Sequence, residues 1–430
     1  MNPIANELNE IIKKYNPTIF ELLSRFGKEI YFPRGILFQG AEAKKQAYKY
    51  NATIGIATEK GEPMHLKSIM NQIHGLTVNE SVNYAPASGN MDLRIKWKEE
   101  MLRKNPSLKN KNTSLPVVTN ALTHGLSLSA DLFVDRGDDV IVPDKIWGNY
   151  NLIFKTKYEA NMNVYPFFHK GGYNLTGLQD TLNSIKRDKI IILLNFPNNP
   201  TGYSILKKEA EELVKNLKEK LDEGRKIVLL SDDAYFGMFY LDNVLKESIF
   251  SKFADLHPNL LAIKIDGATK EDFVWGLRVG FITYSAGNTP KEVYDCIEQK
   301  TMGAIRSNIS NCSGLSQSIV LKSLNSQTVQ QERAEKIAIL EKRAKKVIEV
   351  NKNEEYMIKW EPYPFNSGYF MCMKLKTVNA ENLRKHLLKK YGLGVIAIDD
   401  TDIRVAFSCL EEVEIPEVYE IIYKGILDIE

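Results

Sequence analysis

"KIIILLNFPNNPTGYSILKKEAEELVKNLKEKLDEGRKIVLLSDDAYFG", residues 189–237, contains two apolar runs separated by a charged segment. The runs at 189–196 and 226–231 consist mainly of isoleucine, leucine and valine, which is typical of strands buried on both faces. In the charged segment, apolar residues recur three or four positions apart, as on one face of a helix, at Ala210, Leu213, Leu217 and Leu221. The stretch therefore predicts a strand, a helix and a second strand.

The helix is predicted over residues 204–224. Ser204 suits its N-cap, because a serine hydroxyl can accept a hydrogen bond from a free backbone N–H group of the first turn. Gly224 suits the position after its end, since glycine reaches the left-handed conformation without a steric penalty. These two residues are expected to mark the two ends of the helix that connects the strands.

Similar apolar runs continue on both sides of this stretch. They occupy residues 115–119, 139–143, 163–168, 259–265 and 278–284, with helix-like segments between several of them. Strands that alternate with helices predict an α/β fold with a buried, mostly parallel sheet. We expect seven strands in one large domain.

After residue 315 the pattern changes. Residues 328–350 are predicted to form a long charged helix, and shorter strand-like and helix-like segments follow it. We therefore expect a large domain over residues 61–315. A smaller α+β domain is expected to be built from both ends of the chain, residues 1–60 and 316–430.

Charge and cysteine spacing exclude several classes of function. A net charge of +3 over 430 residues is too small to indicate a partner such as nucleic acid or a membrane surface. The four cysteines lie far apart without a CxxC pair, so neither a metal site nor a disulfide framework is predicted. No apolar signal core begins the chain, and no apolar run approaches the roughly 20 residues that span a bilayer. We expect a cytoplasmic protein.

Chemically active side chains follow most of the predicted strands. Ligands of open parallel sheets bind beyond the carboxyl ends of the strands. The residues found there are Ala121, Leu122, Trp147, Asn199, Asp232, Asp233, Tyr235, Lys270 and Arg278. The backbone N–H groups at the beginning of the helix after residue 120 would favour an anion. A desolvated lysine beside cations can form a Schiff base, a carboxylate can keep a ring nitrogen protonated, and an indole can stack on a ring. This set suits a phosphorylated aromatic cofactor that carries an aldehyde.

Three segments carry a resemblance to a known family. "NFPNNPTG" (195–202), "SDDAYFG" (231–237) and "ATKEDFVWGLRVG" (268–280) resemble, in order and spacing, the signature segments of fold-type I, class I/II aminotransferases that depend on pyridoxal phosphate. The resemblance extends from "YAPASGNMDLR" (84–94) to "IRVAFS" (403–408). It implies the fold-type I architecture and pyridoxal 5′-phosphate as cofactor.

The resemblance also implies roles around the cofactor ring. Lys270 would form the Schiff base and carry protons between the substrate Cα and the cofactor C4′. Asp232 would pair with the pyridinium nitrogen, although its neighbour Asp233 is a rival for this role. Tyr235 and Asn199 would bind the cofactor O3′, and Trp147 would stack on the ring.

At the phosphate, the resemblance implies Arg278 and the backbone of Ala121 and Leu122 as ligands. Two positions depart from the family pattern: Gly267 replaces a serine expected three residues before the lysine, and Ala121 replaces a glycine. Thr269 could compensate for the missing hydroxyl. The segment "PDKIW" before the stacking tryptophan is also longer than the pattern. The nearby His124 is interpreted as a structural histidine.

For substrate and partner, the resemblance implies three further residues. Arg404 would bind the substrate α-carboxylate, together with Asn199. Tyr84 resembles a tyrosine that reaches the phosphate of the neighbouring subunit, which implies a homodimer. Arg306, in "IRSNISN" (305–311), is either the arginine that meets a distal carboxylate in aspartate and aromatic aminotransferases or an ordinary surface arginine.

We therefore predict an aminotransferase. It would move an amino group from an L-amino acid, of the aspartate/glutamate or aromatic type, to a 2-oxo acid such as 2-oxoglutarate, with ping-pong kinetics. A lyase or decarboxylase on the same fold is the alternative, because fold does not determine the bond that breaks. A cofactor-sensing regulatory domain is a more remote alternative.

Overall fold

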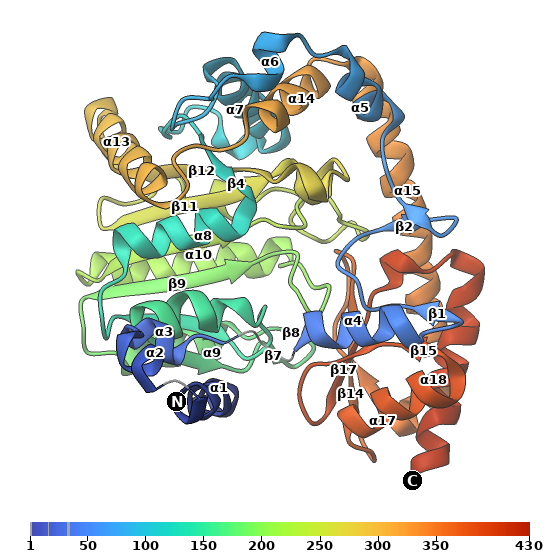
Figure 1. Ribbon diagram of the computed structural model, residues 1–430. Coiled ribbons are helices and arrows are strands. Elements are labelled where there is room, and N and C mark those ends of the chain that lie inside the picture. The colour runs from blue at the N-terminus through green and yellow to red at the C-terminus, as the bar shows by residue number, and fades with distance from the viewer. Residues whose placement is uncertain (1, 16, 32–34) are drawn as a thin grey trace.

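A seven-stranded sheet forms the centre of the larger part of the protein. The computed structural model describes residues 2–15, 17–31 and 35–430 (Figure 1). In spatial order the strands are β4 Val117–Asn120, β12 Val279–Ala286, β11 Leu260–Gly267, β10 Lys226–Asp232, β9 Lys189–Asn195, β5 Asp139–Pro143 and β6 Asn161–Tyr165. All seven predicted strands lie in this one sheet, so the predicted fold class is confirmed. Among these seven strands, β12 alone runs in the direction opposite to the other six.

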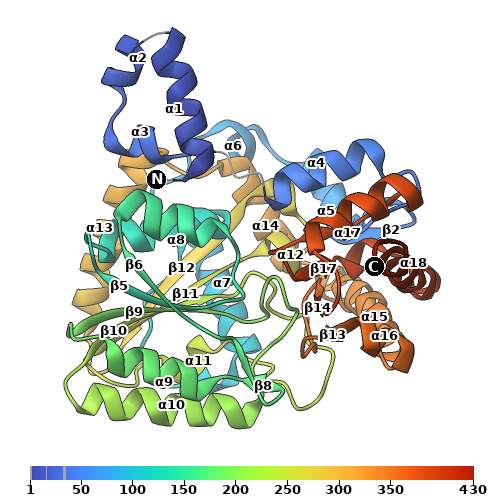
Figure 2. The same ribbon diagram turned by 90° about the horizontal axis from the view of Figure 1, so that it is seen from below.

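Helices cover both faces of the sheet (Figure 2). They are α7 Met91–Lys104, α8 Ala121–Phe133, α9 Leu175–Ser184, α10 Lys207–Asp222, α11 Phe250–Phe253, α13 Lys291–Asn308 and α14 Gly314–Leu324, whereas the short α12 Ala268–Glu271 follows β11 at its carboxyl end. Ile190 and Ile192 of β9 pack in the same core as α9 and α10, whereas Ile191 and Leu193 pack in the core that contains α8. Because successive strand residues point to opposite faces, only an uninterrupted apolar run can fill both cores.

Helix α10 begins later than the sequence predicts. Its first residue is Lys207 and its N-cap position is Leu206, so the predicted cap at Ser204 is wrong. The Leu206 N–H donates to the Glu209 carboxylate at 2.8 Å, which satisfies the helix end from inside the first turn. Ser204 N–H instead donates to the Asn366 side chain at 2.7 Å. Gly224, with φ of +98°, lies just after the helix as predicted.

A second, smaller sheet lies beyond the carboxyl ends of the parallel strands (Figure 1). Its order is β13 Trp360–Pro362, β14 Met371–Leu375, β17 Asp402–Val405 and β16 Ile396–Ala397. The helices around it are α15 Gln327–Val350, α16 Glu354–Lys359, α17 Ala380–His386 and α18 Ile415–Ile429. The long helix α15 matches the helix predicted at 328–350.

The N-terminal segment joins this smaller part through α4 Ile36–Gln46 and β1 Tyr50–Asn51. Strand β1 pairs in parallel with β15 Leu393–Gly394. Other short elements include α5 Lys67–Gln72, α6 Val78–Val82 and the two-stranded pairs β2 Thr58–Glu59 with β3 Glu62–Pro63 and β7 Phe168–His169 with β8 Gly172–Tyr173. Both ends of the chain thus contribute to the smaller part.

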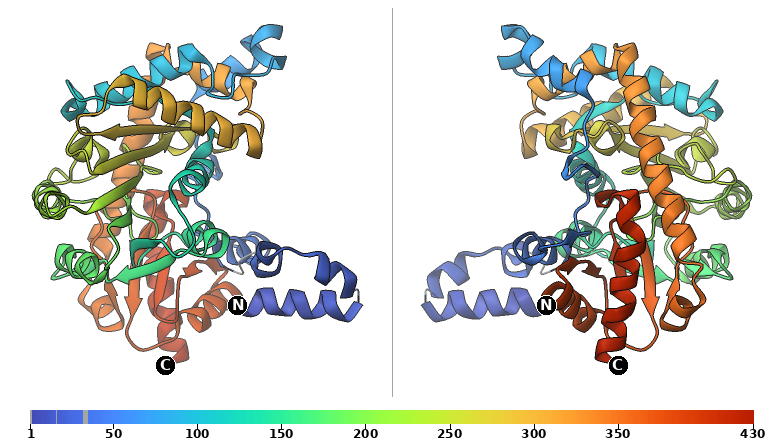
Figure 3. Two further views of the ribbon diagram at one scale, coloured as in Figure 1. Left: turned by 90° about the vertical axis from the view of Figure 1, so that its left-hand side faces the viewer. Right: turned by 90° about the vertical axis from the view of Figure 1, so that its right-hand side faces the viewer.

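The first three helices, α1 Pro3–Tyr15, α2 Pro17–Leu22 and α3 Arg25–Glu29, project as an arm (Figure 3). Arg25 forms an ion pair with Glu159 at 2.8 Å and donates to the Lys157 carbonyl at 3.2 Å. These contacts are with the large domain, although the sequence assigned residues 1–60 to the small one. The division at residues 60 and 315 stays a prediction. None of the helices in the described ranges is long and apolar enough to cross a bilayer.

Candidate active site

A cavity of about 360 Å³ lies where the carboxyl edge of the large sheet meets the smaller part of the molecule. That volume is within the usual range for a small-molecule site. The predicted residues that line it are Ala121, Leu122, Trp147, Asn199, Asp232, Tyr235, Thr269, Lys270, Arg278 and Arg404. The lining residues from Ala121 to Arg278 meet here because parallel strands end at the same edge, and β17 of the smaller sheet adds Arg404 from more than 280 positions after Ala121. Tyr84 and Arg306 do not line it.

Lys270 lies directly after β11, in the short helix α12. Burial lowers the pKa of its amine to about 8, an effect that nearby Arg278 reinforces and Asp232 opposes. Its Nζ lies 4.9 Å from the centre of the Tyr235 ring. An amine with such a pKa is partly neutral near pH 7 and can therefore act as a nucleophile or a base.

Asp232 ends β10 and faces the same cavity. Tyr150 Oη donates to its Oδ2 at 2.5 Å, and the Ala234 N–H donates to its Oδ1 at 3.1 Å. Burial raises the pKa of the carboxyl group, while the Tyr150 hydrogen bond and the charge of Lys270 lower it. A buried carboxylate that has these two hydrogen bonds, and no ion pair among the described residues, can pair with a cationic ring nitrogen.

The rival carboxylate, Asp233, lies outside the lining of the cavity. Its Oδ2 accepts from the Ser248 hydroxyl at 2.6 Å and forms an ion pair with Lys264 at 2.8 Å. Adjacent residues at the end of a strand point to opposite sides, so only one of the two aspartates can face the ligand. The geometry favours Asp232, as the sequence pattern did.

Two cavity residues that sequence reasoning missed support Asp232 and Asn199. Asn195 Nδ2 donates to the Asp232 carbonyl at 2.9 Å, and its Oδ1 accepts from the Asn199 N–H at 2.9 Å. Tyr150 lies three residues after Trp147, and the two rings meet edge to face at 5.6 Å. This spacing was the available signal, since residues three apart share one side of a helical turn.

The first turn of α8 is open toward the cavity. Its backbone N–H groups have no partners within the helix, and Ala121 and Leu122 line the cavity. Ala121 has φ of +59°, the left-handed conformation that explains why a glycine is expected there. His124 Nδ1 accepts from the Asn120 N–H at 3.0 Å, and burial lowers the pKa of the ring. Its Nε2 is buried without a partner among the described residues, so the structural role interpreted from the sequence stays a prediction.

Arg404, on β17, is a fully buried cation at the opposite wall. Burial lowers the pKa of its guanidinium to about 10. Its Nη1 donates to Asn199 Oδ1 at 3.0 Å and its Nη2 to the Thr53 carbonyl at 2.9 Å. The guanidinium carbon lies 4.0 Å from the centre of the Phe370 ring. All these partners are neutral, and Arg404 has no ion pair among the residues that the structure describes. The carboxylate of a substrate would therefore be its first counter-ion.

Tyr84 and Arg306 lie on the surface of the single chain. The Tyr84 side chain is 91% exposed. Arg306 lies in the last turn of α13, where its Nη1 donates to the Ser310 hydroxyl at 2.6 Å. Neither can reach a ligand of its own chain from these positions, and their predicted roles therefore depend on a second copy.

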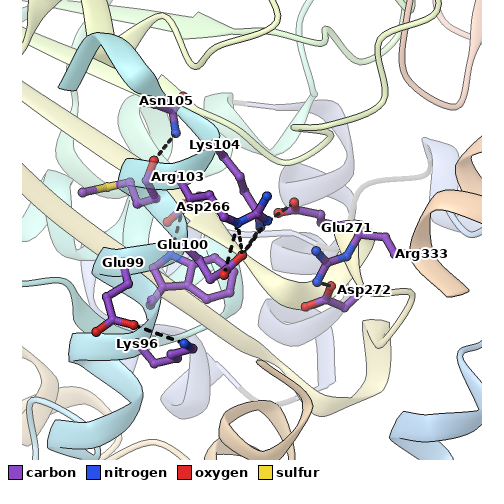
Figure 4. A network of polar contacts seen from close by, with 12 residues as sticks. Lys96, Glu99, Glu100, Arg103, Lys104, Asn105, Asp266, Glu271, Asp272 and Arg333 are labelled. Carbon is purple, nitrogen blue, oxygen red and sulfur yellow. Dashed lines mark hydrogen bonds and ion pairs between the residues drawn. The ribbon is translucent and has the colours of Figure 1, made fainter. Parts of the chain in front are cut away.

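A buried ionic network anchors the turn directly after Lys270 (Figure 4). Glu271 forms an ion pair with Lys104 of α7 at 2.6 Å. Asp272 is ion-paired with Arg333 of α15. The turn that carries the lysine is thus tied to two helices, one of which extends into the smaller part of the molecule.

The mostly parallel seven-stranded sheet, with a buried lysine after β11 and the second domain over its carboxyl edge, defines the fold-type I class of enzymes. The sequence model for "Aminotransferase class I and II" matches residues 61–422. The chain belongs to this family, which confirms the resemblance found in the sequence.

Individual relatives agree with this assignment. The aspartate aminotransferase of Sulfurisphaera tokodaii is 28% identical over 205 residues, 46% of this chain and 47% of that protein. The probable N-acetyl-LL-diaminopimelate aminotransferase of Bacillus subtilis is 24% identical over 265 residues, 61% of this chain and 60% of that protein. These matches span about half of the length of such relatives. The crystal structure of an aminotransferase from Anaerococcus prevotii superposes with a TM-score of 0.81 at 25% identity, covering 92% of this chain and 96% of that one.

Pyridoxal 5′-phosphate is the cofactor of this family, and the cavity fits it. One end combines the first turn of α8 with Arg278 and Thr269, whose buried hydroxyl oxygen has no partner among the described residues. These are donors for a phosphate group. Lys270 and Asp232 line the same cavity, as an aldehyde and a ring nitrogen require. The residues present therefore fit the group.

Proposed function

We propose that the protein is an aminotransferase that moves an amino group from an L-amino acid to a 2-oxo acid. The observation that carries this proposal is one cavity in which Lys270, a buried amine with a pKa of about 8, lies with Asp232 and with the unpaired guanidinium of Arg404. An amine, a carboxylate and a carboxylate-binding cation are the groups that amino-group transfer on pyridoxal phosphate requires.

When bound, the cofactor supplies an electrophilic aldehyde and a ring that withdraws electrons. Lys270 would hold the cofactor and would carry a proton between the substrate Cα and the cofactor C4′. Asp232 would keep the ring nitrogen protonated, and the hydrogen bond from Tyr150 orients that carboxylate. Arg404 aligns the substrate through its α-carboxylate with two parallel hydrogen bonds.

The substrate side chain is proposed to be of the aspartate/glutamate or aromatic type, with 2-oxoglutarate as an acceptor. Ile56, Phe370 and Trp147 form apolar walls of the cavity, which supports an aromatic side chain. The cations in the lining are Lys270, Arg278 and Arg404 among the described residues, and each already has a proposed role. A distal carboxylate would therefore need a cation from another source.

A homodimer is proposed to supply that cation. The exposure of Tyr84 and Arg306 in the single chain supports their contribution to the cavity of a second copy. Mixing an inactive Lys270→Ala chain with a chain carrying Arg306→Ala or Tyr84→Phe should yield hybrid dimers whose activity differs from either parent. A monomer by light scattering at micromolar concentration would contradict the dimer. The cytoplasmic location stays a prediction.

The proposal is tested by the absorption spectrum of the protein loaded with pyridoxal phosphate, before and after addition of a panel of L-amino acids. We expect the visible band to disappear with a productive amino acid and to return with 2-oxoglutarate. Production of oxo acid that needs no acceptor would instead identify a lyase, and loss of carbon dioxide a decarboxylase. Arg404→Lys should raise KM for every amino acid roughly 10-fold or more, because a lysine cannot bind a carboxylate at two points.

A further inference from the structure

We infer that the indole N–H of Trp275 is a direct ligand of the cofactor phosphate and replaces the hydroxyl that this chain lacks at position 267. The inference rests on the proposed function, since it concerns the same cavity. It adds a residue that neither the sequence motifs nor the resemblance singled out.

The observation that carries the inference is an unsatisfied donor. Trp275 Nε1 is buried and has no hydrogen-bond partner among the described residues, and the side chain lines the cavity. The large majority of buried polar atoms in proteins are hydrogen-bonded, because a buried donor without a partner is costly. The missing acceptor is therefore expected to come from a ligand.

The backbone of residue 275 lies on the same turn as two of the proposed phosphate ligands. The Val274 N–H donates to the Thr269 carbonyl at 3.1 Å, which closes the turn and places residue 275 beside Thr269. Arg278 Nη1 donates to the Trp275 carbonyl at 3.3 Å. Thr269, Trp275 and Arg278 thus lie on one short segment that is closed by hydrogen bonds, and all three line the cavity.

The Thr269 hydroxyl is an independent sign of the same absent acceptor. Its oxygen is buried and unpartnered like the indole nitrogen. A phosphate ester offers three strong acceptor oxygens, enough for both neutral donors in addition to Arg278 and the first turn of α8. Two orphan donors on one turn, beside a guanidinium, indicate an anion with several oxygens.

The geometry at position 267 explains why a second donor is needed. A Cβ on Gly267 would lie 2.6 Å from the Val279 carbonyl oxygen and 2.7 Å from Gly280 Cα. Strand β11 pairs Gly267 directly with Gly280 of β12, so the two backbones approach too closely for a serine. The usual hydroxyl cannot be restored there without moving β12. An indole from the following turn can reach the phosphate without that change.

A role in packing alone does not account for the orphan nitrogen. The Trp275 ring meets Phe273 edge to face at 5.9 Å, and a phenylalanine would make the same contact. Burying a nitrogen that forms no hydrogen bond would then be a net cost. The substitution Trp275→Phe therefore separates the two roles, because it keeps most of the ring and removes only the N–H donor.

The decisive experiment compares pyridoxal phosphate with pyridoxal, which lacks the phosphate. Dissociation constants of both are measured by absorbance on apoprotein, for the wild type, Trp275→Phe and Trp147→Phe. We expect Trp275→Phe to weaken pyridoxal phosphate about 10-fold, the size of one hydrogen bond to a charged group, and pyridoxal by less than about twofold. The matched control Trp147→Phe should weaken both ligands alike, because it alters only the contact with the ring.

Equal weakening of both ligands by Trp275→Phe, or no weakening of either, would overturn the inference while leaving the proposed function intact. A wild type that binds pyridoxal phosphate without forming a borohydride-reducible link at Lys270 would instead overturn the proposed function.

If Trp275→Phe does not fold, the wild type labelled with ¹⁵N-tryptophan provides the same test. The four tryptophan N–H signals are assigned with single Trp→Phe variants at the other positions. The Trp275 signal should shift on addition of pyridoxal phosphate and of inorganic phosphate, but not of pyridoxal. A Trp275 signal that does not shift on addition of pyridoxal phosphate or inorganic phosphate would contradict the inference.

Discussion

Two buried lysines lie six residues apart, one within β11 and one just after it, and they differ in almost every property. Lys264 forms ion pairs with Asp233 at 2.8 Å and Asp266 at 2.5 Å, and these charges raise its pKa to about 12. Lys270 is less buried, at the wall of the cavity; it has no ion pair among the described residues, and the burial of its amine lowers the pKa to about 8. Burial penalises both amines; only Lys264 has carboxylates in contact to offset the penalty.

The same contrast divides the two aspartates at the end of β10. Asp233 is held by Lys264 and the Ser248 hydroxyl, whereas Asp232 faces the cavity and accepts from Tyr150. One lysine and one aspartate thus form a closed ion pair, and the other two line an open cavity. The comparison teaches that residue type and burial do not define a reactive group; the absence of a permanent counter-ion does.

The largest expected effect is that of Lys270→Met. It should slow the amino-acid half-reaction by about 10⁴-fold, at the upper end of what proton transfer by a side chain contributes. It should not destabilise the apoprotein at pH 7, because the wild type must hold a poorly solvated amine there. Single-turnover spectra and thermal melting measure the two effects. A variant that retained a borohydride-reducible link to the cofactor would contradict the assignment of Lys270.

Lys264→Met is the matched variant and should behave in the opposite way. Removing one partner of a buried ion network is expected to cost about 3–5 kcal/mol of unfolding free energy, since Asp233 and Asp266 would be left without their counter-ion. The folded fraction should keep its turnover rate. Urea unfolding and active-site titration measure these quantities. A loss of rate without a loss of stability would break the distinction between the two lysines.

Asp232→Asn and Asp233→Asn test the two carboxylates. Asp232→Asn should slow the half-reaction about 10²–10³-fold, the usual effect of removing one electrostatic group from a reacting centre, with little change in stability. Asp233→Asn should lower stability and leave the rate within a few-fold. The same two assays apply to both variants. If the two rates fell equally, the division of roles at the end of β10 would be wrong.

The smallest expected effect is in the pH dependence of the rate at which the apoprotein captures the cofactor. Pyridoxal phosphate is captured by the neutral amine, so the capture rate of the apoprotein should rise roughly 10-fold between pH 7 and 9 and level off, as a pKa near 8 requires. An ordinary lysine would show a rise that continues toward pH 10.5. Stopped-flow absorbance measures the rate. A profile without a plateau would contradict the lowered pKa.

Because proton binding is linked to folding, the two lysines should change the pH dependence of stability in opposite directions. Between about pH 8 and 10.5 the unfolded chain keeps a proton on Lys270 that the folded chain has lost, so this lysine makes the apoprotein more stable as pH rises. Between 10.5 and about 12 the folded chain keeps the proton on Lys264, so stability falls as pH rises. Denaturant titrations of the wild type and of each Lys→Met variant isolate these slopes.

Much of the fold was predictable because a strand buried on both faces needs an uninterrupted apolar run. That rule located all seven strands of the large sheet. It could not reveal that β12 runs antiparallel, because apolar composition carries no direction. The N-cap preference of serine wrongly placed the start of α10 at Ser204, since a local preference could not anticipate that Asn366, 162 residues later, would bind the backbone there.

The candidate site was predictable where its residues follow strands directly. Lys270, Asp232 and Asn199 were found in this way, because parallel strands bring their ends together. Tyr150 and Trp275 were missed because their importance lies in single atoms, a hydroxyl on Asp232 and an unpartnered indole nitrogen. No local sequence pattern indicates whether a buried hydrogen-bond donor has an acceptor in the folded protein.

The sequence by itself determined the sheet, the family and the set of chemical groups at one edge, because periodicity and motif order are local and survive without coordinates. Only the tertiary structure decided which lysine and which aspartate remain without a permanent counter-ion. The reason is physical: a pKa and an orphan donor depend on every atom within a few ångströms, and in a folded chain most of those atoms come from distant parts of the sequence.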